Sequence, residues 1–335
     1  MTALSSTWPS HPELHPALRV LVVNPFARGT DRAAIARVVE RLRLDGRAVR
    51  EVGRDGSARR LAAEAVRARA GRVLAAGGDG TLHEIIQELA GTATALGVIP
   101  LGTSNDLANR LGIPRDLGAA CAVALCGAVE AVDVLAMGDT RVATVGGFGL
   151  PAWIARTCNA LRGDPRTRRF VRPLGRGIYT AVAGARILAR GGSAVECTLR
   201  PNRGAPATFP VVAVLAGLQE RFGGGIRLVD ARRLVPGTFA ALVVTARHRT
   251  ELLSVLLRLK LGRPVTRGAH LFTGLTSLDL RAAGPLAAFG DGEWLGVRHR
   301  ATLTVERHAL RVVVPRRLAA AAAGAGAAPR LGEAV

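Results

Sequence analysis

The sequence of 335 residues predicts an α/β fold in two domains, a Rossmann-like parallel sheet followed by a mainly antiparallel β-sandwich. Between residues 17 and 133, short apolar runs alternate with amphipathic segments, as in a parallel sheet that is covered on both faces. Between residues 134 and 317, strand-like runs follow one another with few helices between them, which is typical of antiparallel sheets. Residues 1–16 and the Ala- and Gly-rich residues 318–335 are expected to be disordered.

The first domain carries apolar runs that predict buried strands and amphipathic segments that predict helices. Its strands are expected at residues 19–23, 48–52, 72–76 and 96–99, and its helices at residues 31–44, 57–70 and 81–89. Asp31 is expected to cap the first helix, because its side chain can accept a hydrogen bond from a free amide there. In the second domain, strands are expected at residues 141–145, 194–200, 208–215, 238–245, 277–281 and 301–306, and helices at residues 174–190 and 251–261. The pattern leaves open whether the carboxyl end of this domain returns to the first.

The chain is strongly basic, with 46 Lys and Arg against 25 Asp and Glu, and Lys260 is its one lysine. A genomic bias toward Arg, Ala and Gly explains part of this excess, but a surface of such charge attracts anionic membranes and polyanions whatever its origin. Nucleic acid is not an expected partner. The 8 Phe, 3 Trp and 1 Tyr are not interleaved with the arginines, as a base-stacking surface requires.

No apolar run reaches the ~18 residues of a transmembrane helix, and the first residues lack the basic and apolar blocks of a secretory signal. The four cysteines form no CxxC pair, so neither a zinc site nor a disulfide framework is expected. These observations predict a cytoplasmic protein in peripheral contact with an anionic membrane surface. They leave the oligomeric state open, a homodimer included.

The strongest chemical signal is the turn Gly77-Gly78-Asp79-Gly80-Thr81, between an expected strand and an expected helix. Glycines let backbone amides approach a phosphate closely, and the helix N-terminus behind them carries partial positive charge. An aspartate in an anion-binding turn would repel the phosphates. It is favourable there when a cation such as Mg²⁺ bridges its carboxylate and the phosphates. The alternative is a tight turn in which Asp79 only caps the helix.

Two further polar loops follow strands of the same predicted sheet. Their candidate residues are Asn24, Pro25, Gly102, Thr103, Asn105 and Asp106. In an open parallel sheet, the loops at the carboxyl ends of the strands share one crevice, where ligands bind. The sequence has neither a Walker A lysine pattern nor a dinucleotide-binding glycine fingerprint. We therefore expect a nucleotide site built from backbone amides, Thr and Asn side chains, and a metal.

These loops resemble the diacylglycerol kinase catalytic-domain family, which includes sphingosine kinases and bacterial lipid kinases. The resemblance is carried by VVNPFARG (22–29), GGDGTLHEIIQEL (77–89), PLGTSNDLANRLGIP (100–114) and FGDGEWLG (289–296). GGDGT alone is shared with NAD kinases and, more loosely, with phosphofructokinases, whereas its pairing with GTSNDLA and a late DGE is specific to lipid kinases. The resemblance implies transfer of the γ-phosphoryl group of Mg-ATP to the hydroxyl of a diacylglycerol- or sphingoid-like lipid.

The resemblance also implies roles for individual residues. Those implied to bind the nucleotide are Asn24, Pro25, Gly77, Gly78, Asp79, Gly80, Thr81, Gly102, Thr103 and Asn105. Asp79, Asp106 and Asp133 would serve the hydrated Mg²⁺. Asp291 would be the general base for the lipid hydroxyl, and Glu293 would orient Asp291 or the metal.

Other segments allow two interpretations each. Residues 146–149 resemble the family's glycine-rich entry into the lipid-binding domain, or only allow close packing. A basic run, either a membrane contact or a solvated loop, contains Arg166, Arg168, Arg169, Arg172 and Arg176. His83 and Glu84 follow the first loop, where Glu84 either supports that loop or is a solvated helix residue. The seven histidines form no metal-binding cluster.

The chain departs from the family pattern at Pro236-Gly237, where many bacterial members have Asp-Gly and bind a structural Mg²⁺. Only Asp230 offers a carboxylate nearby, so this second metal is in doubt. The alternatives to a lipid kinase are an NAD kinase and a catalytically silent membrane-binding member of the fold.

Overall fold

The computed structural model describes residues 15–25, 32–44, 48–53, 57–175, 177–222 and 225–316. The ends expected to be disordered lie outside these residues, except for His15 and Pro16, which begin strand β1 (His15–Val23). Asp31, the expected helix cap, also lies outside them.

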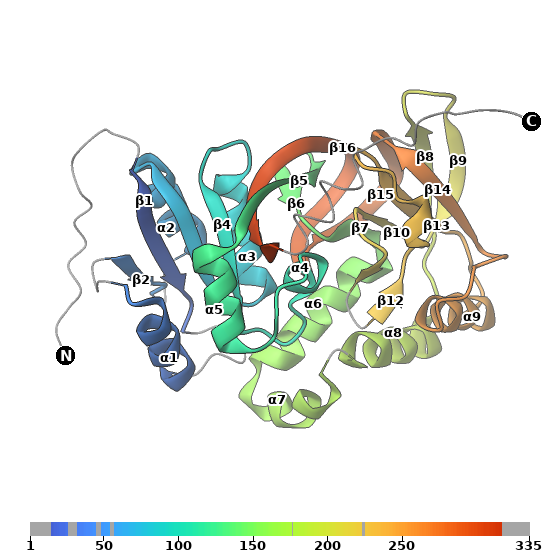
Figure 1. Ribbon diagram of the computed structural model, residues 1–335. Helices are drawn as coiled ribbons and strands as arrows, with labels where there is room; N and C mark the ends of the chain where they lie inside the picture. Colours follow the sequence, from blue (N-terminus) through green and yellow to red (C-terminus); the bar gives the residue numbers. More distant parts are fainter. Residues whose placement is uncertain are drawn as a thin grey trace, which may run out of the picture.

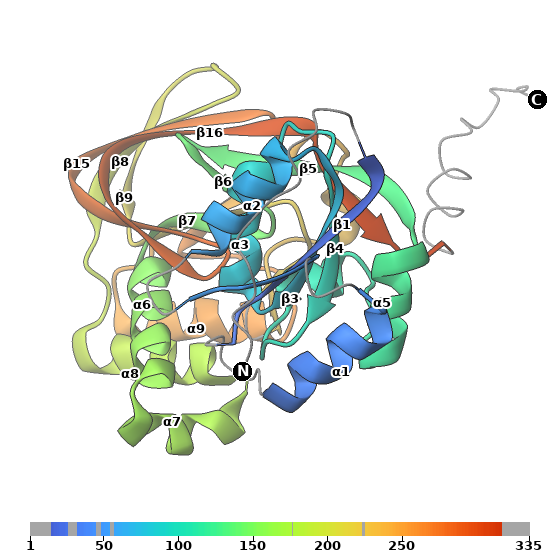
Figure 2. The ribbon, with the colours of Figure 1, turned by 90° about the vertical axis from the view of Figure 1, so that its left-hand side faces the viewer.

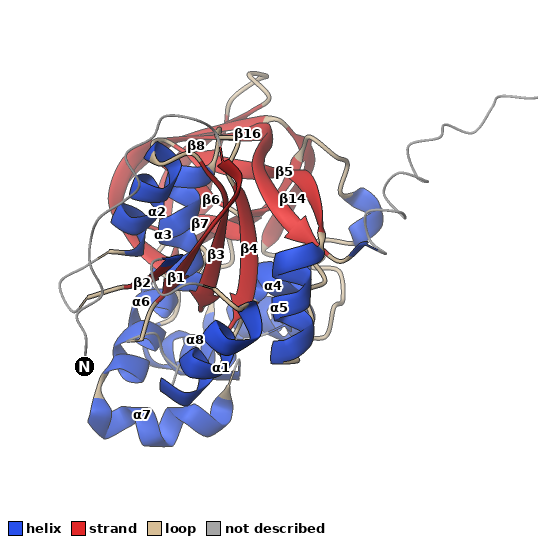
Figure 3. Cartoon of the chain, turned by 60° about the vertical axis from the view of Figure 1, so that its left-hand side comes forward, coloured by secondary structure: helices blue, strands red, loops and turns tan. Residues whose placement is uncertain are grey.

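The first part of the chain forms a parallel sheet in the order β4-β3-β1-β2. The other three strands are β2 (Val49–Glu51), β3 (Ala70–Gly77) and β4 (Ala95–Pro100). Helices α2 (Ala58–Arg67) and α3 (Asp79–Leu89) cover one face, and α1 (Arg32–Leu42) and α5 (Leu117–Cys126) cover the other (Figure 2 and Figure 3). Alternate residues of β1 explain both layers, since Val20 and Val22 pack toward α2 and α3 while Leu21 and Val23 pack toward α1 and α5.

The second part is built mainly from antiparallel strands, with four helices along one side (Figure 1). Its strands are β5 (Ala128–Met137), β6 (Thr140–Val142), β7 (Val145–Gly149), β8 (Val195–Pro201), β9 (Ala207–Val211), β10 (Ala213–Gly217), β11 (Arg221–Phe222), β12 (Ile226–Arg227), β13 (Phe239–Val244), β14 (Ala269–Leu275), β15 (Ser277–Gly290) and β16 (Glu293–Val314). Its helices are α6 (Leu150–Gly163), α7 (Pro165–Val171), α8 (Gly177–Arg190) and α9 (Arg249–Lys260), and the short α4 (Asp106–Arg110) precedes α5. No helix of the described residues is both long and apolar enough to cross a bilayer.

The two parts share one sheet of 14 strands, because β16 joins them. Near its start β16 pairs with β15, and near its end it pairs with β5 and, at Val312 opposite Leu96, in parallel with β4. The fold class predicted from the sequence is confirmed: the strands are parallel toward the N-terminus and antiparallel toward the C-terminus. The strands expected at residues 277–281 and 301–306 are only pieces of β15 and β16.

Strand β7 leads from the sheet into α6 and explains the glycines at residues 146–149. Gly147 has φ of 156°, and a Cβ atom there would lie 1.9 Å from the carbonyl oxygen of Val214 on β10. Gly149, with φ of 83°, is the N-cap of α6. A larger residue at Gly147 would push β7 away from β10, so close packing alone requires glycine at that position.

Candidate active site

A cavity of about 610 Å³ lies between the loops that follow β3 and β4, the turn between β15 and β16, and helices α6, α8 and α9. One end is polar and is lined by Asn24, Gly78, Asp79, Gly80, Thr81, His83, Gly102, Thr103, Asp106, Asp291 and Glu293. The other end is apolar and is lined by Ile154, Ile187, Val212, Leu215, Leu252, Val255, Leu256 and Leu259. The cavity therefore joins a polar site at the carboxyl ends of parallel strands to an apolar pocket in the antiparallel part.

The first glycine loop turns directly from β3 into α3. Gly77 ends the strand, Gly78 is the N-cap of α3, and Asp79 is the first residue of the helix. The side chain of Asn24, just after β1, donates a hydrogen bond of 3.2 Å to the hydroxyl of Thr81. This bond ties the end of β1 to the helix N-terminus, where free backbone amides favour an anion.

The second loop lies against the first. A Cβ atom on Gly102 would be 2.6 Å from the Cα atom of Gly78, so the two glycines let the loops touch. The amide of Asp106 donates to the carboxylate of Asp79 at 2.7 Å. Asn105, with φ of 49°, folds its amide onto Gly102, accepting from the Gly102 amide and donating to its carbonyl oxygen. Asn105 thus shapes the loop and does not line the cavity.

The electrostatics of the polar end are dominated by carboxylates. Burial, together with the neighbouring charges of Asp106 and Asp291, raises the pKa of Asp79 to about 7. Among the described residues that line the cavity, five are acidic, Asp79, Glu84, Asp106, Asp291 and Glu293, and one is an arginine, Arg162. Such an excess of buried acid is costly unless a cation neutralises it.

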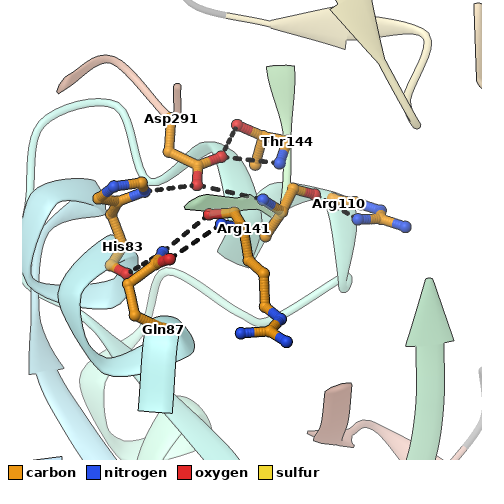
Figure 4. A network of polar contacts seen from close by, with 7 residues as sticks. His83, Gln87, Arg110, Arg141, Thr144 and Asp291 are labelled. Atoms are coloured by element: carbon orange, nitrogen blue, oxygen red, sulfur yellow. Dashed lines mark hydrogen bonds and ion pairs between the residues drawn. The ribbon is translucent and has the colours of Figure 1, made fainter. Parts of the chain in front are cut away.

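Asp291 lies in the turn between β15 and β16, with φ of 51°, and is buried (Figure 4). Its Oδ1 accepts from the amide and the hydroxyl of Thr144, at 2.8 and 2.7 Å. Its Oδ2 accepts from the amide of Ala143 at 3.1 Å and contacts Nδ1 of His83 at 3.0 Å. The carboxylate is therefore fixed by the segment between β6 and β7 and by helix α3.

His83 lies on α3 one turn after Asp79 and is also buried. Burial lowers the pKa of His83, but the hydrogen bond to Asp291 and the charges of Asp291, Glu293 and Glu84 outweigh it, so the pKa is raised. Glu84 itself accepts from the hydroxyl of Ser57 at 2.5 Å and connects α3 to the start of α2.

Glu293 brings the late DGE segment onto the first glycine loop. A Cβ atom on Gly80 would lie 2.6 Å from Oε1 of Glu293. Asn159 on α6 donates to the carbonyl oxygen of Gly292 at 2.9 Å and to Oε2 of Glu293 at 3.3 Å. Residues from both ends of the chain thus meet at one polar site.

Besides Asn105, three other residues expected at the site do not line the cavity. Pro25 lies just after the end of β1, and Gly77 is the last residue of β3. Asp133, expected near the metal, accepts at 2.8 Å from the amide of Gly237 and at 2.9 Å from the amide of His308. Asp133 thus ties β5 to β16 and to the turn before β13, and the structure does not bring it together with Asp79.

At the departure Pro236-Gly237, the Gly237 amide binds Asp133, and nothing in the structure explains the proline at position 236. Asp230 caps a 3₁₀ helix (Ala231–Arg233) and forms an ion pair of 2.8 Å with Arg227. Within the described part of the chain, no group of three or more His, Cys, Asp and Glu residues is arranged to hold a metal. In the basic run, Arg166, Arg168 and Arg169 lie on α7; the side chains of Arg172 and Arg176 lie outside the described residues.

Sequence reasoning noted His83 without a role at the site, and it did not single out four other residues that line the cavity, namely Thr144, Asn159, Arg162 and Tyr179. Arg162 on α6 donates to the Tyr179 hydroxyl at 3.1 Å and to the carbonyl oxygen of Gly175 at 3.0 Å. His83 had a signal, since it lies one helical turn from Asp79 and so on the same face of α3. The others carry no local pattern that distinguishes them.

Comparison with known proteins agrees with the motifs. Residues 19–137 match the diacylglycerol kinase catalytic domain. A probable lipid kinase YegS-like of Klebsiella pneumoniae is 36% identical over 138 residues, which cover 39% of this chain and 46% of that protein. One of Chromohalobacter salexigens is 33% identical over 215 residues, which cover 61% of this chain and 63% of its own. The matches thus span less than two thirds of these relatives.

The fold is that of a solved structure, a putative diacylglycerol kinase from Bacillus anthracis. That structure superposes with a TM-score of 0.69 over 90% of this chain and 98% of its own, at 18% identity. The family resemblance stated from the loops is confirmed over residues 19–137, which match the diacylglycerol kinase catalytic domain.

Proposed function

We propose that this protein is an ATP-dependent lipid kinase that transfers the γ-phosphoryl group to the hydroxyl of a diacylglycerol- or sphingoid-like lipid. One observation carries the proposal: a single cavity is acidic and glycine-rich at one end and apolar at the other. A lipid alcohol fits both ends at once, with its hydroxyl at the polar end and its chain in the apolar pocket. The apolar end favours a lipid over a nicotinamide nucleotide, which is polar throughout.

ATP would bind at the polar end. The amides of residues 77–81 and the N-terminus of α3 suit the phosphates, and Thr103 faces the same space. Glycines at Gly78 and Gly102 keep side chains out of this space and let the two loops touch. Arg162 supports the proposal, because it is an arginine that lines the cavity and a guanidinium can pair with phosphate charge.

We infer that Mg²⁺ binds with the nucleotide through Asp79 and Asp106. Mg²⁺ commonly uses one or two protein carboxylates together with substrate phosphates, so a set of two suffices. The raised pKa of Asp79 supports this inference, since the buried carboxylate lacks a cation of its own. When bound, the ion would neutralise phosphate charge during transfer. Asp133 is not included, because both of its oxygens accept backbone amides outside the cavity.

The acceptor hydroxyl would lie beside Asp291 and Glu293, opposite the glycine loops. Asp291 is buried, and its hydrogen bonds hold the carboxylate in one orientation. This fixed orientation lowers the entropic cost of reaching a reactive geometry. The apolar pocket between α8, α9 and the sheet would hold the chain. Its side chains select for apolarity rather than for one lipid, so diacylglycerols, sphingoid bases and isoprenoid alcohols all remain candidate acceptors.

We also propose that helices α6 to α9 touch an anionic membrane. This face exposes large apolar side chains, among them Trp153, Phe170 (67% exposed), Leu188, Leu257 and Leu261. Arginine guanidiniums lie over two of these rings, Arg186 on Trp153 at 5.1 Å and Arg169 on Phe170 at 4.6 Å. Apolar groups that insert and arginines that meet lipid phosphates, at about 1 kcal/mol each, suit such a surface.

Two experiments test these proposals. The full chain is incubated with Mg-[γ-³²P]ATP and mixed micelles of diacylglycerol, sphingosine or an isoprenoid alcohol, with NAD as a competing acceptor. Labelled lipid supports the lipid kinase, whereas labelled NADP or no product contradicts it. For the membrane face, Phe170→Ser should weaken sedimentation with phosphatidylglycerol vesicles, while Val297→Ser, on exposed β16, should not. Equal loss in both variants would contradict the assignment of this face.

A further inference from the structure

The carboxylate of Asp291 has no acceptor site left for a substrate hydroxyl. A carboxylate offers about four lone-pair positions, and here four donors occupy them. The donors are the amides of Ala143 and Thr144, the Thr144 hydroxyl and Nδ1 of His83 (Figure 4). To take a proton itself, Asp291 would first have to release one of these buried hydrogen bonds.

His83 offers the free hydrogen-bond acceptor that Asp291 lacks. Because Asp291 is an acceptor, Nδ1 of His83 carries the hydrogen of their 3.0 Å contact. In the neutral imidazole the other nitrogen, Nε2, then holds a free lone pair. Nε2 has no hydrogen-bond partner among the described residues, it points away from Asp291, and the ring lines the cavity (Figure 4).

We propose that His83 Nε2 is the atom that accepts the proton of the lipid hydroxyl, and that Asp291 acts as the positioning partner of His83. The proposal rests on the lipid kinase function proposed above. In the transfer, the O–H bond breaks and its proton goes to Nε2, while its electron pair forms the new bond to the γ-phosphorus. The bond from that phosphorus to the bridging oxygen breaks, and its electrons leave with ADP. The imidazolium then releases its proton to water.

The surroundings of His83 suit the imidazolium that this step creates. The carboxylates that face the ring are Asp291 in the β15–β16 turn, Glu293 on β16 and Glu84 on α3. Arg110, the nearest guanidinium behind Asp291, is held on the carbonyl oxygen of Ala143. The same division of work, a buried aspartate that orients a histidine base, is found in hydrolytic triads.

The decisive variant is His83→Asn. The amide of asparagine places a donor where Nδ1 was, so the bond to Asp291 can persist while Nε2 is lost. We expect kcat to fall by about 10²- to 10⁴-fold, which is the usual contribution of a general base. Binding of Mg-ATP, measured by its thermal shift, should be unchanged. His83→Ala should be inactive and should regain activity when imidazole is added.

The pH profile gives a readout that a structural role would not move. A histidine base must be neutral, so wild-type kcat/KM should fall as the pH drops through the pKa of His83, which lies above its ordinary 6.5. His83→Asn should lose this acidic limb.

The outcomes separate the two proposals. If the wild type phosphorylates none of the lipids, the kinase function is wrong, and this inference with it. If the wild type is active and His83→Asn keeps both its rate within about threefold and its acidic limb, only the role of His83 is refuted. A slow His83→Asn that keeps the limb, with no imidazole rescue of His83→Ala, also refutes it.

Discussion

Replacing Asp79 by Asn should stabilise the ligand-free protein while it destroys the proposed metal site. Burial raises the pKa of Asp79 from 3.8 to about 7, so the folded state resists losing this proton. At about 1.4 kcal/mol per pKa unit, the charged form costs at most about 4 kcal/mol at pH 8. Because Asp79 lines a cavity and is only half-buried, we expect about half, ~2 kcal/mol. Asparagine keeps the acceptor for the Asp106 amide and carries no charge.

The pH window follows from the two pKa values. Below pH 3.8 the carboxyl is protonated in both the folded and the unfolded state, so wild type and Asp79→Asn differ little. Between 3.8 and about 7 the unfolded chain loses its proton first, so the stability of the wild type falls as the pH rises. The free energy of unfolding of Asp79→Asn should not fall in this range, because asparagine does not titrate. The difference in stability between the variant and the wild type should therefore grow through this pH window and stay constant above it.

The assay is thermal unfolding at pH 5 and pH 8, with and without Mg-ATP. At pH 8 without ligand we expect the Tm of Asp79→Asn to exceed that of the wild type by roughly 3 °C, and the gap at pH 5 to be less than half of that. Mg-ATP should raise the Tm of the wild type only. Asp139→Asn, in an exposed turn between β5 and β6, is the matched control and should behave as the wild type. A lower Tm for Asp79→Asn at pH 8, or an equal gap at both pH values, would refute the reasoning.

Three further substitutions test other parts of the site. Gly102→Ala puts a Cβ atom 2.6 Å from the backbone of Gly78, so it should cost about 1–3 kcal/mol and weaken ATP binding in a titration. Gly184→Ala, in open space on α8, is its control and should not destabilise. Asp133→Ala leaves two backbone amides without their acceptor and should lower stability by about 1–3 kcal/mol in urea unfolding, with the Mg-ATP thermal shift retained. Leu256→Trp fills part of the apolar pocket and should raise the KM for long-chain lipids more than for short-chain ones, with the KM for ATP unchanged.

The parallel half of the molecule is well predicted from the sequence because its buried strands are continuous apolar runs. The expected strand at residues 72–76 lies within β3, and that at 96–99 lies within β4. The loops that follow them meet in space because the carboxyl ends of parallel strands share one edge. Here local composition and tertiary structure point the same way.

The antiparallel half is less predictable, since pairing across long sequence distances decides its elements. Strand β16 runs through 22 residues of mixed exposure because partners on both sides hold it, and no local alternation marks that length. Helix α6 begins directly after the glycines of β7, and these glycines give no sign in the sequence that a helix follows.

The same reason explains why the sequence does not show which side chains meet at the site. His83 and Asp291 are 208 positions apart, and only the fold shows that they touch. Asn105 and Asp133 have the residue types of ligands, but their neighbours decide where their side chains point. Asn105 forms two hydrogen bonds with the backbone of Gly102, and Asp133 accepts hydrogen bonds from two amides outside the cavity.

The pairing of β16 with β4 means that the segment matching the diacylglycerol kinase catalytic domain does not contain all the strands of its own sheet. Leu310, Val312 and Val314 belong to the same apolar cluster as Leu96 and Val98 of β4. A fragment that stops at residue 137 would leave β4 as an unpaired edge strand, and such an edge favours aggregation. During synthesis, β4 therefore lacks its partner until residues 293–314 of β16 have left the ribosome.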